Sequence, residues 1–295
     1  MSFRLKRGVP LSRRLQRLMK KEFAAAMSAL ASRTPDDESV HEARKSVKKI
    51  RSILRLLEDE LGSAGARAEK RLRTAAHALS SLRDANATAE TLETLHGFYP
   101  KVVDRSVMRA VARGLGARRR RTRKGAGLLA HKARACMGRA RDAVPSEIRR
   151  AAGRGAVLSG LSTGYGRARR RLRGLSLDSD ATQFHALRRR VKEHTHHVRL
   201  FEGLHATPRA RARSLDRLDE WLGEDHNQAI LSAVILAAPE RFGPASATTA
   251  VLGSIVKRQG YLRHRALRLG HRLFAEKPRR FREAARGWWP RGSRR

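Results

Sequence analysis

Residues 40–61 restrict the fold of this chain most strongly, because their polar and apolar side chains separate with the period of an α-helix. At about 100° per residue, one face of such a helix holds the basic side chains. This first cationic stripe consists of His41, Arg44, Lys45, Lys48, Arg51 and Arg55. The opposite, apolar face consists of Val47, Ile50, Ile53, Leu54, Leu57 and Leu61. The segment therefore predicts an amphipathic helix with an apolar face in a core and an uninterrupted cationic stripe opposite it.

A second segment, residues 184–201, repeats this pattern 144 positions later. His41 corresponds to His185 and Arg44 to Arg188, and the apolar positions follow the same shift. The second cationic stripe consists of His185, Arg188, Arg189, Lys192, His196 and Arg199. One short basic motif is unspecific, but two copies, each in phase with its own apolar face, indicate a duplicated unit.

A shorter motif supports the duplication. Asp84 and Asn86 follow the first basic segment, and Asp225 and Asn227 follow the second with the same D-x-N spacing. The two aspartates are candidate catalytic carboxylates, or they cap helices and hold basic side chains in position. Neither has a paired acid nearby in the sequence, so the structural role is favoured.

Helical periodicity continues along the chain, and no segment alternates convincingly as a strand would. We expect eight helices, near residues 11–31, 39–61, 64–95, 101–141, 146–174, 180–203, 208–238 and 245–276. The predicted fold is all-α, with two homologous halves of four helices each. The expected divisions are a first half at 1–143, a second half at 144–276 and a basic tail at 277–295.

Local signals mark the ends of several helices. Ser39 and Glu42 predict a capping box for the first basic helix, and Asp180 and Gln183 could cap the second. Gly62 is expected to close the first basic helix. The glycines between residues 114 and 127 predict a kink or break in the fourth helix.

These features together resemble the CHAD domain, the conserved histidine α-helical domain. The resemblance depends on the two basic helices, the two D-x-N segments and the Arg-rich helical chain, and it extends over about residues 10–276. It implies two four-helix bundles that are related by internal duplication as a pseudo-twofold, and whose basic helices face a shared groove or pore that binds inorganic polyphosphate. Some members of the family also contain a CYTH triphosphatase domain. Its E-x-E-x-K motif does not occur here, so we expect a stand-alone CHAD protein.

The formal net charge of +39 indicates a polyanionic partner. The resemblance implies that this partner is polyphosphate, bound by the two stripes without catalysis, and that the protein associates with polyphosphate granules. Nonspecific binding of DNA or RNA is the alternative, because any strong polycation binds nucleic acid. Aromatic content is only 5%, and no recognised nucleic-acid-binding signature occurs. A phosphohydrolase is a third hypothesis, but a P-loop, an acidic metal cage and a recognisable nucleophile are missing from the sequence.

The histidines offer a further alternative, a zinc site. His196 and His197 lie near His185 in the sequence, but no cysteine or carboxylate recurs at ligand spacing, and neighbouring arginines would repel a cation. We therefore expect no metal and no cofactor. On the helical wheel His194 lies on the apolar side, where we expect a core histidine with satisfied hydrogen bonds.

Two dense basic clusters, at residues 118–124 and 169–173, could extend the anion-binding surface or contact nucleic acid. The first is a candidate exposed loop. Trp288 and Trp289 in the tail could stack on bases, lie at a membrane interface or plug the bundle.

The single cysteine, Cys136, excludes an internal disulfide framework and fits a reducing compartment. Its interpretation is a small core residue. No run of about 18 apolar residues is present, so we expect no membrane-spanning helix. The expected location is the cytoplasm.

Overall fold

The computed structural model describes residues 3–289, apart from the side chains of Ser81, residues 83–86 and Thr122. Within these residues the chain forms helices and no strand, which confirms the all-α prediction. The α-helices are α1 (Leu11–Ala29), α2 (Asp37–Leu56), α3 (Glu58–Ala78), α4 (Ser80–Phe98), α5 (Arg105–Arg123), α6 (Ala126–Ala151), α7 (Arg154–Arg173), α8 (Ala181–Leu200), α9 (Ala206–Leu236), α10 (Ala245–Leu273) and α11 (Pro278–Arg286). Two short 3₁₀ helices are η1 (Phe201–Gly203) and η2 (Pro239–Phe242).

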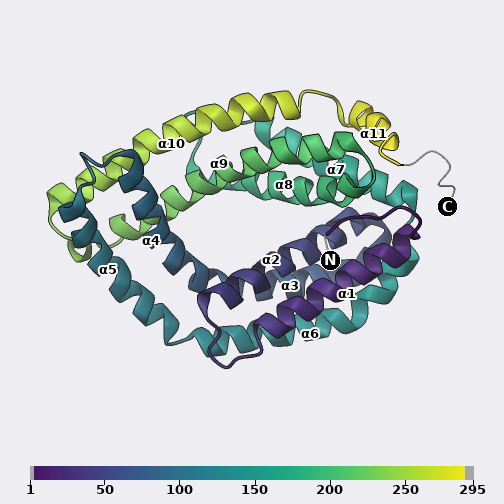
Figure 1. Ribbon diagram of the computed structural model, residues 1–295, viewed down its shortest axis with the longest axis horizontal. Coiled ribbons are helices and arrows are strands. Elements are labelled where there is room, and N and C mark those ends of the chain that lie inside the picture. The colour runs from purple at the N-terminus through teal and green to yellow at the C-terminus, as the bar shows by residue number, and fades with distance from the viewer. Residues whose placement is uncertain (1–2, 290–295) are drawn as a thin grey trace.

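The helices are arranged as an elongated ring (Figure 1). One long side contains α1, α2, α3 and α6, and the other contains α8, α9 and α10. At one end of the ring α4 packs on α5 and also contacts α9, and at the other end α7 contacts α2, α8 and α11. The two basic helices, α2 and α8, contact each other near the middle of the molecule. This placement brings together two segments that are 144 positions apart in the sequence.

Two of the expected helices are divided in the structure. The predicted 64–95 helix is interrupted at Leu79, between α3 and α4, and the predicted 101–141 helix is interrupted at residues 124–125, between α5 and α6. The second interruption lies within the glycine-containing stretch where a break was expected. Gly62 does not end α2. It has a left-handed φ of +47° inside α3 and produces a kink there, because glycine adopts this conformation without a steric penalty.

The N-terminal caps of the two basic helices differ from each other. The predicted Ser39–Glu42 box is wrong, because α2 begins three residues earlier and its cap is Asp36, whose Oδ1 accepts a hydrogen bond from the Ser39 amide at 2.7 Å. The Asp180–Gln183 box of α8 is confirmed. The Gln183 amide donates to Asp180 at 2.8 Å, and the Asp180 amide donates to the Gln183 side chain at 3.0 Å.

The buried side chains form two hydrophobic clusters. The larger cluster joins α1, α2, α3 and α6 to α7, α8, α9 and α11, and the apolar faces of both basic helices are part of it. The smaller cluster joins α4 and α5 to α9, α10 and η2 through residues such as Leu92, Val111, Leu231, Phe242 and Val251. Helices before and after position 144 therefore share both cores, and α6 itself continues through Pro145 to Ala151. The internal duplication stays a prediction.

The backbones of α2 and α7 approach each other closely at Gly160. A Cβ atom on Gly160 would lie 1.8 Å from the carbonyl oxygen of Leu56, which is far inside van der Waals contact. Only glycine allows these two helices to pack at this distance. The contact joins one long side of the ring to the end that contains α7, close to the point where α2 meets α8.

The described part of the C-terminal tail packs on the bundle. Trp288 is 4% exposed, and its ring packs edge-on against Phe201 and Phe281. Trp289 also contacts Phe201, with ring centroids 4.7 Å apart. Both tryptophans therefore pack against the helical bundle, which is one of the three roles considered for them. None of the described helices is long and apolar enough to cross a membrane.

Candidate functional site

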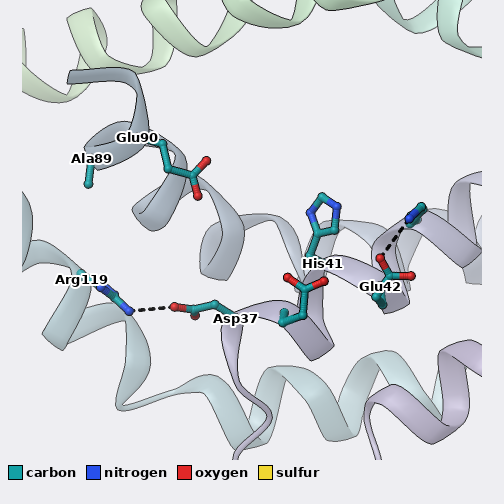
Figure 2. A pocket seen from close by; sticks show the side chains of 8 residues that line it. Asp37, His41, Glu42, Ala89, Glu90 and Arg119 are labelled. Atoms are coloured by element: carbon teal, nitrogen blue, oxygen red, sulfur yellow. Dashed lines mark hydrogen bonds and ion pairs between the residues drawn. The ribbon is translucent and has the colours of Figure 1, made fainter. Parts of the chain in front are cut away.

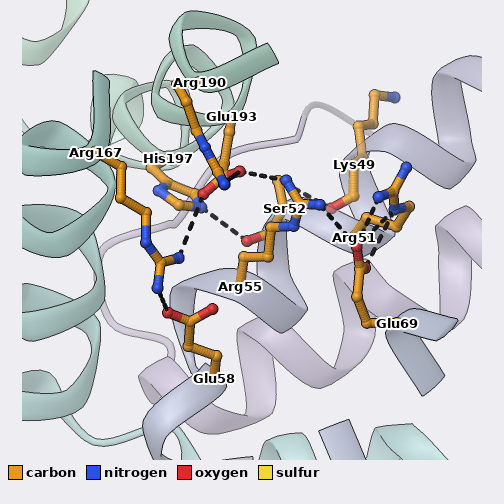
Figure 3. Close-up of polar contacts among 10 residues, drawn as sticks. All are labelled: Lys49, Arg51, Ser52, Arg55, Glu58, Glu69, Arg167, Arg190, Glu193 and His197. Atoms are coloured by element: carbon orange, nitrogen blue, oxygen red, sulfur yellow. Dashed lines mark hydrogen bonds and ion pairs between the residues drawn. The ribbon is translucent and has the colours of Figure 1, made fainter. Parts of the chain in front are cut away.

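Two polar contacts join α2 to α8. The backbone carbonyl of Ser52 lies 2.8 Å from Nε2 of His197, and Arg55 forms an ion pair with Glu193 (Figure 3). Both helices present their apolar faces to the core, where Ile50, Ile53 and Val198 are fully buried. The amphipathic pattern therefore turns the polar faces of the two helices out of the core. The contacts at Ser52 and Arg55 fix the position of one polar face relative to the other.

Four cations from the two helices lie near one another, and the charges of three of them act on the fourth, Lys48. We call this set the central cation cluster; it consists of Arg44, Lys48, Arg188 and Lys192. Surrounding protein atoms remove part of the solvation of Lys48, although solvent still reaches its side chain. This loss, together with the charges of Arg44, Arg188 and Lys192, lowers the pKa of Lys48 to about 8, against a smaller opposing effect of Asp219. An anion that reached this point would be attracted by all four groups.

Two histidines lie beside the cluster. His185 of α8 packs against His226 of α9, with ring centroids 4.0 Å apart. Burial and the charges of Arg188 and Arg189 lower the pKa of His185 to about 4. Burial, His185 and the cations Arg188, Lys48 and Arg44 lower the pKa of His226 to about 3. Both rings are therefore neutral near pH 7 in the free protein.

Neighbouring elements position the cluster. Arg44 donates to the hydroxyl of Ser80 at 2.8 Å, at the start of α4. The guanidinium group of Arg188 lies over Gly223 of α9, where a Cβ atom would contact it at 3.5 Å. Lys192 forms an ion pair with Asp219 of α9 at 2.5 Å. These supporting residues come from α4 and α9, and the helical pattern of α2 and α8 contains no signal for them.

The uninterrupted cationic stripe predicted for α2 is wrong at its C-terminal end. Glu69 of α3 accepts hydrogen bonds from Arg51 at 2.6 Å and from Arg55 at 2.8 Å, and Glu193 pairs with Arg55 from the other side (Figure 3). The carboxylates raise the pKa of Arg55 against the effect of burial. Tertiary packing thus neutralises two cations that the sequence shows without a partner, since the acids come from other helices.

His41 and Lys45 belong to a cavity lining that includes none of the four cations of the central cation cluster. They line a cavity of about 520 Å³ together with Asp37, Glu42 and Glu90 (Figure 2). Both side chains are exposed, and Lys45 pairs with Glu42 at 3.0 Å. His41 therefore lies among carboxylates, whereas His185 lies beside arginine and a second histidine. The two histidines of the repeated motif have different surroundings.

The remaining members of the second cationic stripe also differ from one another in their surroundings. Arg189 is exposed. Its pKa is lowered by loss of solvation and by the positive charges of nearby arginines, which are Arg190, Arg55, Arg171 and Arg51. Arg199 pairs with Asp216 at 2.7 Å. His196 is only 5% exposed and packs under Phe3, so it lies in the interior and not on the exposed part of the stripe.

His194 is a core residue, as its position on the helical wheel predicted. Its ring is fully buried against Tyr165, Phe274 and Phe281. The prediction that its hydrogen bonds are satisfied is wrong within the described residues, because neither ring nitrogen has a protein partner there. Burial, with smaller effects of Arg211 and His197, places its pKa well below the usual range.

Asp225 holds basic side chains in position. Its Oδ1 accepts hydrogen bonds from Arg263 at 2.8 Å and from Gln259 at 3.1 Å, and Arg263 also donates to the carbonyl of Ser179. Asp225 thereby joins α9 and α10 to the segment before α8. The side chains of Asp84 and Asn86 lie outside the described residues. Asn227 lines a cavity of about 320 Å³ that also contains Arg188.

The two dense basic clusters lie on helices. The first, expected as a candidate loop, is part of α5, where Arg119 and Arg123 pair with Asp37 of α2. In the second, on α7, Arg169 donates to the carbonyl of Phe274 at 3.1 Å. Among the described residues no group of three or more histidine, cysteine, aspartate or glutamate side chains could hold a metal ion.

His226 is the site residue that the sequence analysis did not single out. It stands in the D-x-N segment, between Asp225 and Asn227, so the motif already marked its position. Asp219 and Ser80 have no comparable signal, because their contacts with the basic helices depend on packing over long sequence distances.

A family model of the CHAD domain matches residues 11–236 of this chain. The crystal structure of the CHAD domain from the plant Ricinus communis is similar to the chain, with a TM-score of 0.64 and 17% sequence identity over 93% of this chain and 95% of that chain. At this identity the structural likeness establishes the fold alone. No curated protein matches the sequence significantly.

Proposed function

The chain belongs to the CHAD domain family, and from this premise we propose that it binds inorganic polyphosphate at the central cation cluster. The observation that supports the proposal best is the convergence of Arg44 and Lys48 with Arg188 and Lys192. Burial of Lys48 and the charges of Arg44, Arg188 and Lys192 beside it together lower the pKa of Lys48 to about 8. Neighbouring positive charges raise the free energy of the unbound protein, and a bound anion would lower it again.

A phosphate chain suits this arrangement for geometric reasons. Each unit of the chain presents charged oxygens, so successive phosphates can contact successive cations along α2 and α8. Guanidinium groups form paired, charge-assisted hydrogen bonds with phosphate oxygens, and an ammonium group adds a compact charge. Release of counterions from the polyanion adds to the affinity.

The two histidines next to the cluster fit a role in binding. In the free protein His185 and His226 are neutral and can donate one hydrogen bond each. A bound phosphate would raise their pKa values by offsetting the charge of Arg188. They would therefore take up protons on binding only when the pH is low.

Catalysis is not part of the proposal. Asp225 has a structural role in holding Arg263, and the cluster itself consists of cations that lie beside two histidines. The expected result is that the protein releases no phosphate from polyphosphate when Mg²⁺ or Mn²⁺ is added. We further propose a location in the cytoplasm at polyphosphate granules, which the family resemblance implies.

The test compares two double variants that remove the same charge. Lys48→Gln with Arg188→Gln alters the cluster, and Arg13→Gln with Lys20→Gln removes two exposed cations of α1. Affinity for long-chain polyphosphate is measured at several salt concentrations. The cluster variant should bind at least tenfold more weakly, with a slope of log affinity against log salt that is shallower by about 1 to 2. The α1 variant should stay close to wild type.

Equal losses in the two variants would contradict a site at the cluster and would indicate a general effect of net charge. Competition with DNA tests the alternative ligand. If polyphosphate displaces DNA at a lower phosphate concentration than DNA displaces polyphosphate, the proposal holds. The reverse order would favour a nucleic-acid-binding protein.

A further inference from the structure

The outer side of α9 and α10 contains a second concentration of arginine. A cavity of about 690 Å³ lies between the two helices. We call it the outer groove, and its basic and aromatic lining consists of Arg213, Arg217, Arg265, Arg268, Arg272 and Trp221. The arginines follow helical spacing on each helix, so their side chains meet from both walls.

The outer groove is separate from the central cation cluster. Arg217 and Asp219 are two positions apart on α9, and residues at this separation point in nearly opposite directions from a helix. Asp219 faces Lys192 of α8, so Arg217 faces away from α8. The lining residues of the groove include none of the four cluster cations. An anion in one site would leave the other site accessible.

The charges in the groove lack compensation. Within the described part of the chain, none of its five arginines forms an ion pair with a carboxylate. On the same helix, by contrast, Asp216 and Asp219 pair with Arg199 and Lys192 on the other face. Helix α9 thus separates its acids from the groove. Like charges within one or two turns repel, so a bound polyanion would stabilise this surface.

The aromatic wall favours a phosphate chain over nucleic acid. The guanidinium group of Arg265 lies over the Trp221 ring at 4.6 Å from its centroid, and it also hydrogen-bonds Tyr261. This face of the indole is therefore covered by a cation and not free to stack on a base. Arg265 contacts Trp221 and Tyr261, and among the described residues its remaining N–H groups have no hydrogen-bond partner, which suits recognition of phosphate oxygens.

The groove continues toward the N-terminal end of α9. Arg213 also lines a neighbouring cavity of about 470 Å³, in which Arg4, Arg199 and Arg209 lie. That cavity contains Glu202 and Asp216 as well, which pair with Arg4 and Arg199. The uncompensated charge is therefore concentrated between α9 and α10.

We propose that the outer groove is a second binding site for a linear phosphate chain, so that one protein molecule holds two separate chains or two segments of one long chain. The proposal shares its ligand class with the proposed function but depends on different residues. Either site can exist without the other, and the experiment measures them separately.

The experiment uses a short linear oligophosphate and the full-length protein. Calorimetric titration gives the number of sites, and tryptophan fluorescence reports on Trp221 in the groove. The groove variant contains Arg217→Gln, Arg268→Gln and Arg272→Gln. The matched control contains Arg13→Gln, Arg17→Gln and Lys20→Gln, which removes the same charge from the exposed side of α1. Glutamine keeps a high helix propensity in both variants.

We expect two sites in the wild type and in the α1 control, and one site in the groove variant. The fluorescence change should be lost in the groove variant and in Trp221→Phe, while Trp221→Phe keeps two sites. The Lys48→Gln, Arg188→Gln variant should keep the fluorescence change and lose the other site. That last variant separates the two hypotheses, because it alters only the central cation cluster.

A single site in the wild type, or the same stoichiometry in the groove variant and the α1 control, would overturn the proposal. So would stronger binding of a single-stranded oligonucleotide than of an oligophosphate with equal phosphate number, if the groove variant abolished it. That outcome would assign the groove to nucleic acid. Circular dichroism of each variant checks that the helices remain folded.

Discussion

Lys192 of α8 and Asp219 of α9 form an ion pair at 2.5 Å, so one cation of the central cluster already has an anionic partner in the free protein. The other carboxylate oxygen of Asp219, Oδ1, is buried and has no hydrogen-bond partner among the described residues. Asp219 therefore neutralises part of the cluster and competes with an incoming phosphate for Lys192.

Removing this competitor should strengthen binding. We expect Asp219→Asn to raise the affinity for polyphosphate several-fold, or by about 1 kcal/mol, because the substitution frees Lys192 and removes a repulsive charge. Glu283→Gln is the control, since it removes an equal charge from the exposed Arg279–Glu283 pair on α11. Titrations at pH 7 and constant salt give both affinities. Equal gains would attribute the effect to net charge alone.

The pH dependence of binding should follow Lys48. Its pKa of about 8 in the free protein means that it loses charge as the pH rises past 8, while a bound anion favours the charged form. Affinity should therefore fall about tenfold between pH 7 and 9. Lys48→Arg keeps its charge throughout this range and should show a much smaller decrease. Parallel pH profiles for wild type and Lys48→Arg would exclude Lys48 as the titrating group.

Acid should destabilise the fold through His194. Burial keeps this histidine neutral in the folded state, with its pKa well below the usual value, whereas the unfolded chain binds a proton near pH 6.5. The unfolded state thus holds more protons below that pH, and stability decreases as the pH falls. Between pH 7.5 and 5 the contribution is about 2 kcal/mol.

The corresponding variant is His194→Leu, which cannot take up the proton. Urea denaturation at both pH values should show a smaller acid-induced loss in this variant than in wild type. His131→Gln, an exposed position on α6, is the control and should behave like wild type. The prediction fails if His194→Leu and His131→Gln lose the same stability.

Gly160 should tolerate no side chain. Gly160→Ala places a methyl group 1.8 Å from the Leu56 carbonyl oxygen and should cost about 3 kcal/mol or more, because α2 and α7 must separate. Gly155→Ala, on the same helix with open space around it, should be neutral or stabilising by up to about 1 kcal/mol. Thermal unfolding of the two variants gives the comparison, and similar melting temperatures would contradict the tight contact.

Much of the fold follows from patterns within one or two helical turns. The period of apolar residues in α2 and α8 predicted both helices and the face that each buries, and the Asp180–Gln183 cap was visible as a spacing of three residues. The break between α5 and α6 was expected from the glycines around it. The first cap was misplaced because Asp36 competes with Ser39 for the same role, and the sequence shows both as good capping residues.

The candidate site was only partly predictable. The stripes correctly named the four cations that converge, but they also included Arg51 and Arg55, which Glu69 neutralises, and His196, which lies in the interior. His41 and His185 were equivalent in the sequence and have different neighbours in the structure. A helical wheel shows the direction of a side chain from its own axis and contains no information on which helix lies opposite.

The sequence by itself determined the helical class, the amphipathic faces and the excess of positive charge, because these depend on composition and on contacts between residues three or four positions apart. Tertiary structure alone decided which carboxylates lie against these cations. Asp219, Glu69 and Glu193 reach the basic helices through packing over long sequence distances. The outer groove likewise exists only because α9 and α10 pack side by side, which brings two separate sets of arginines to one surface.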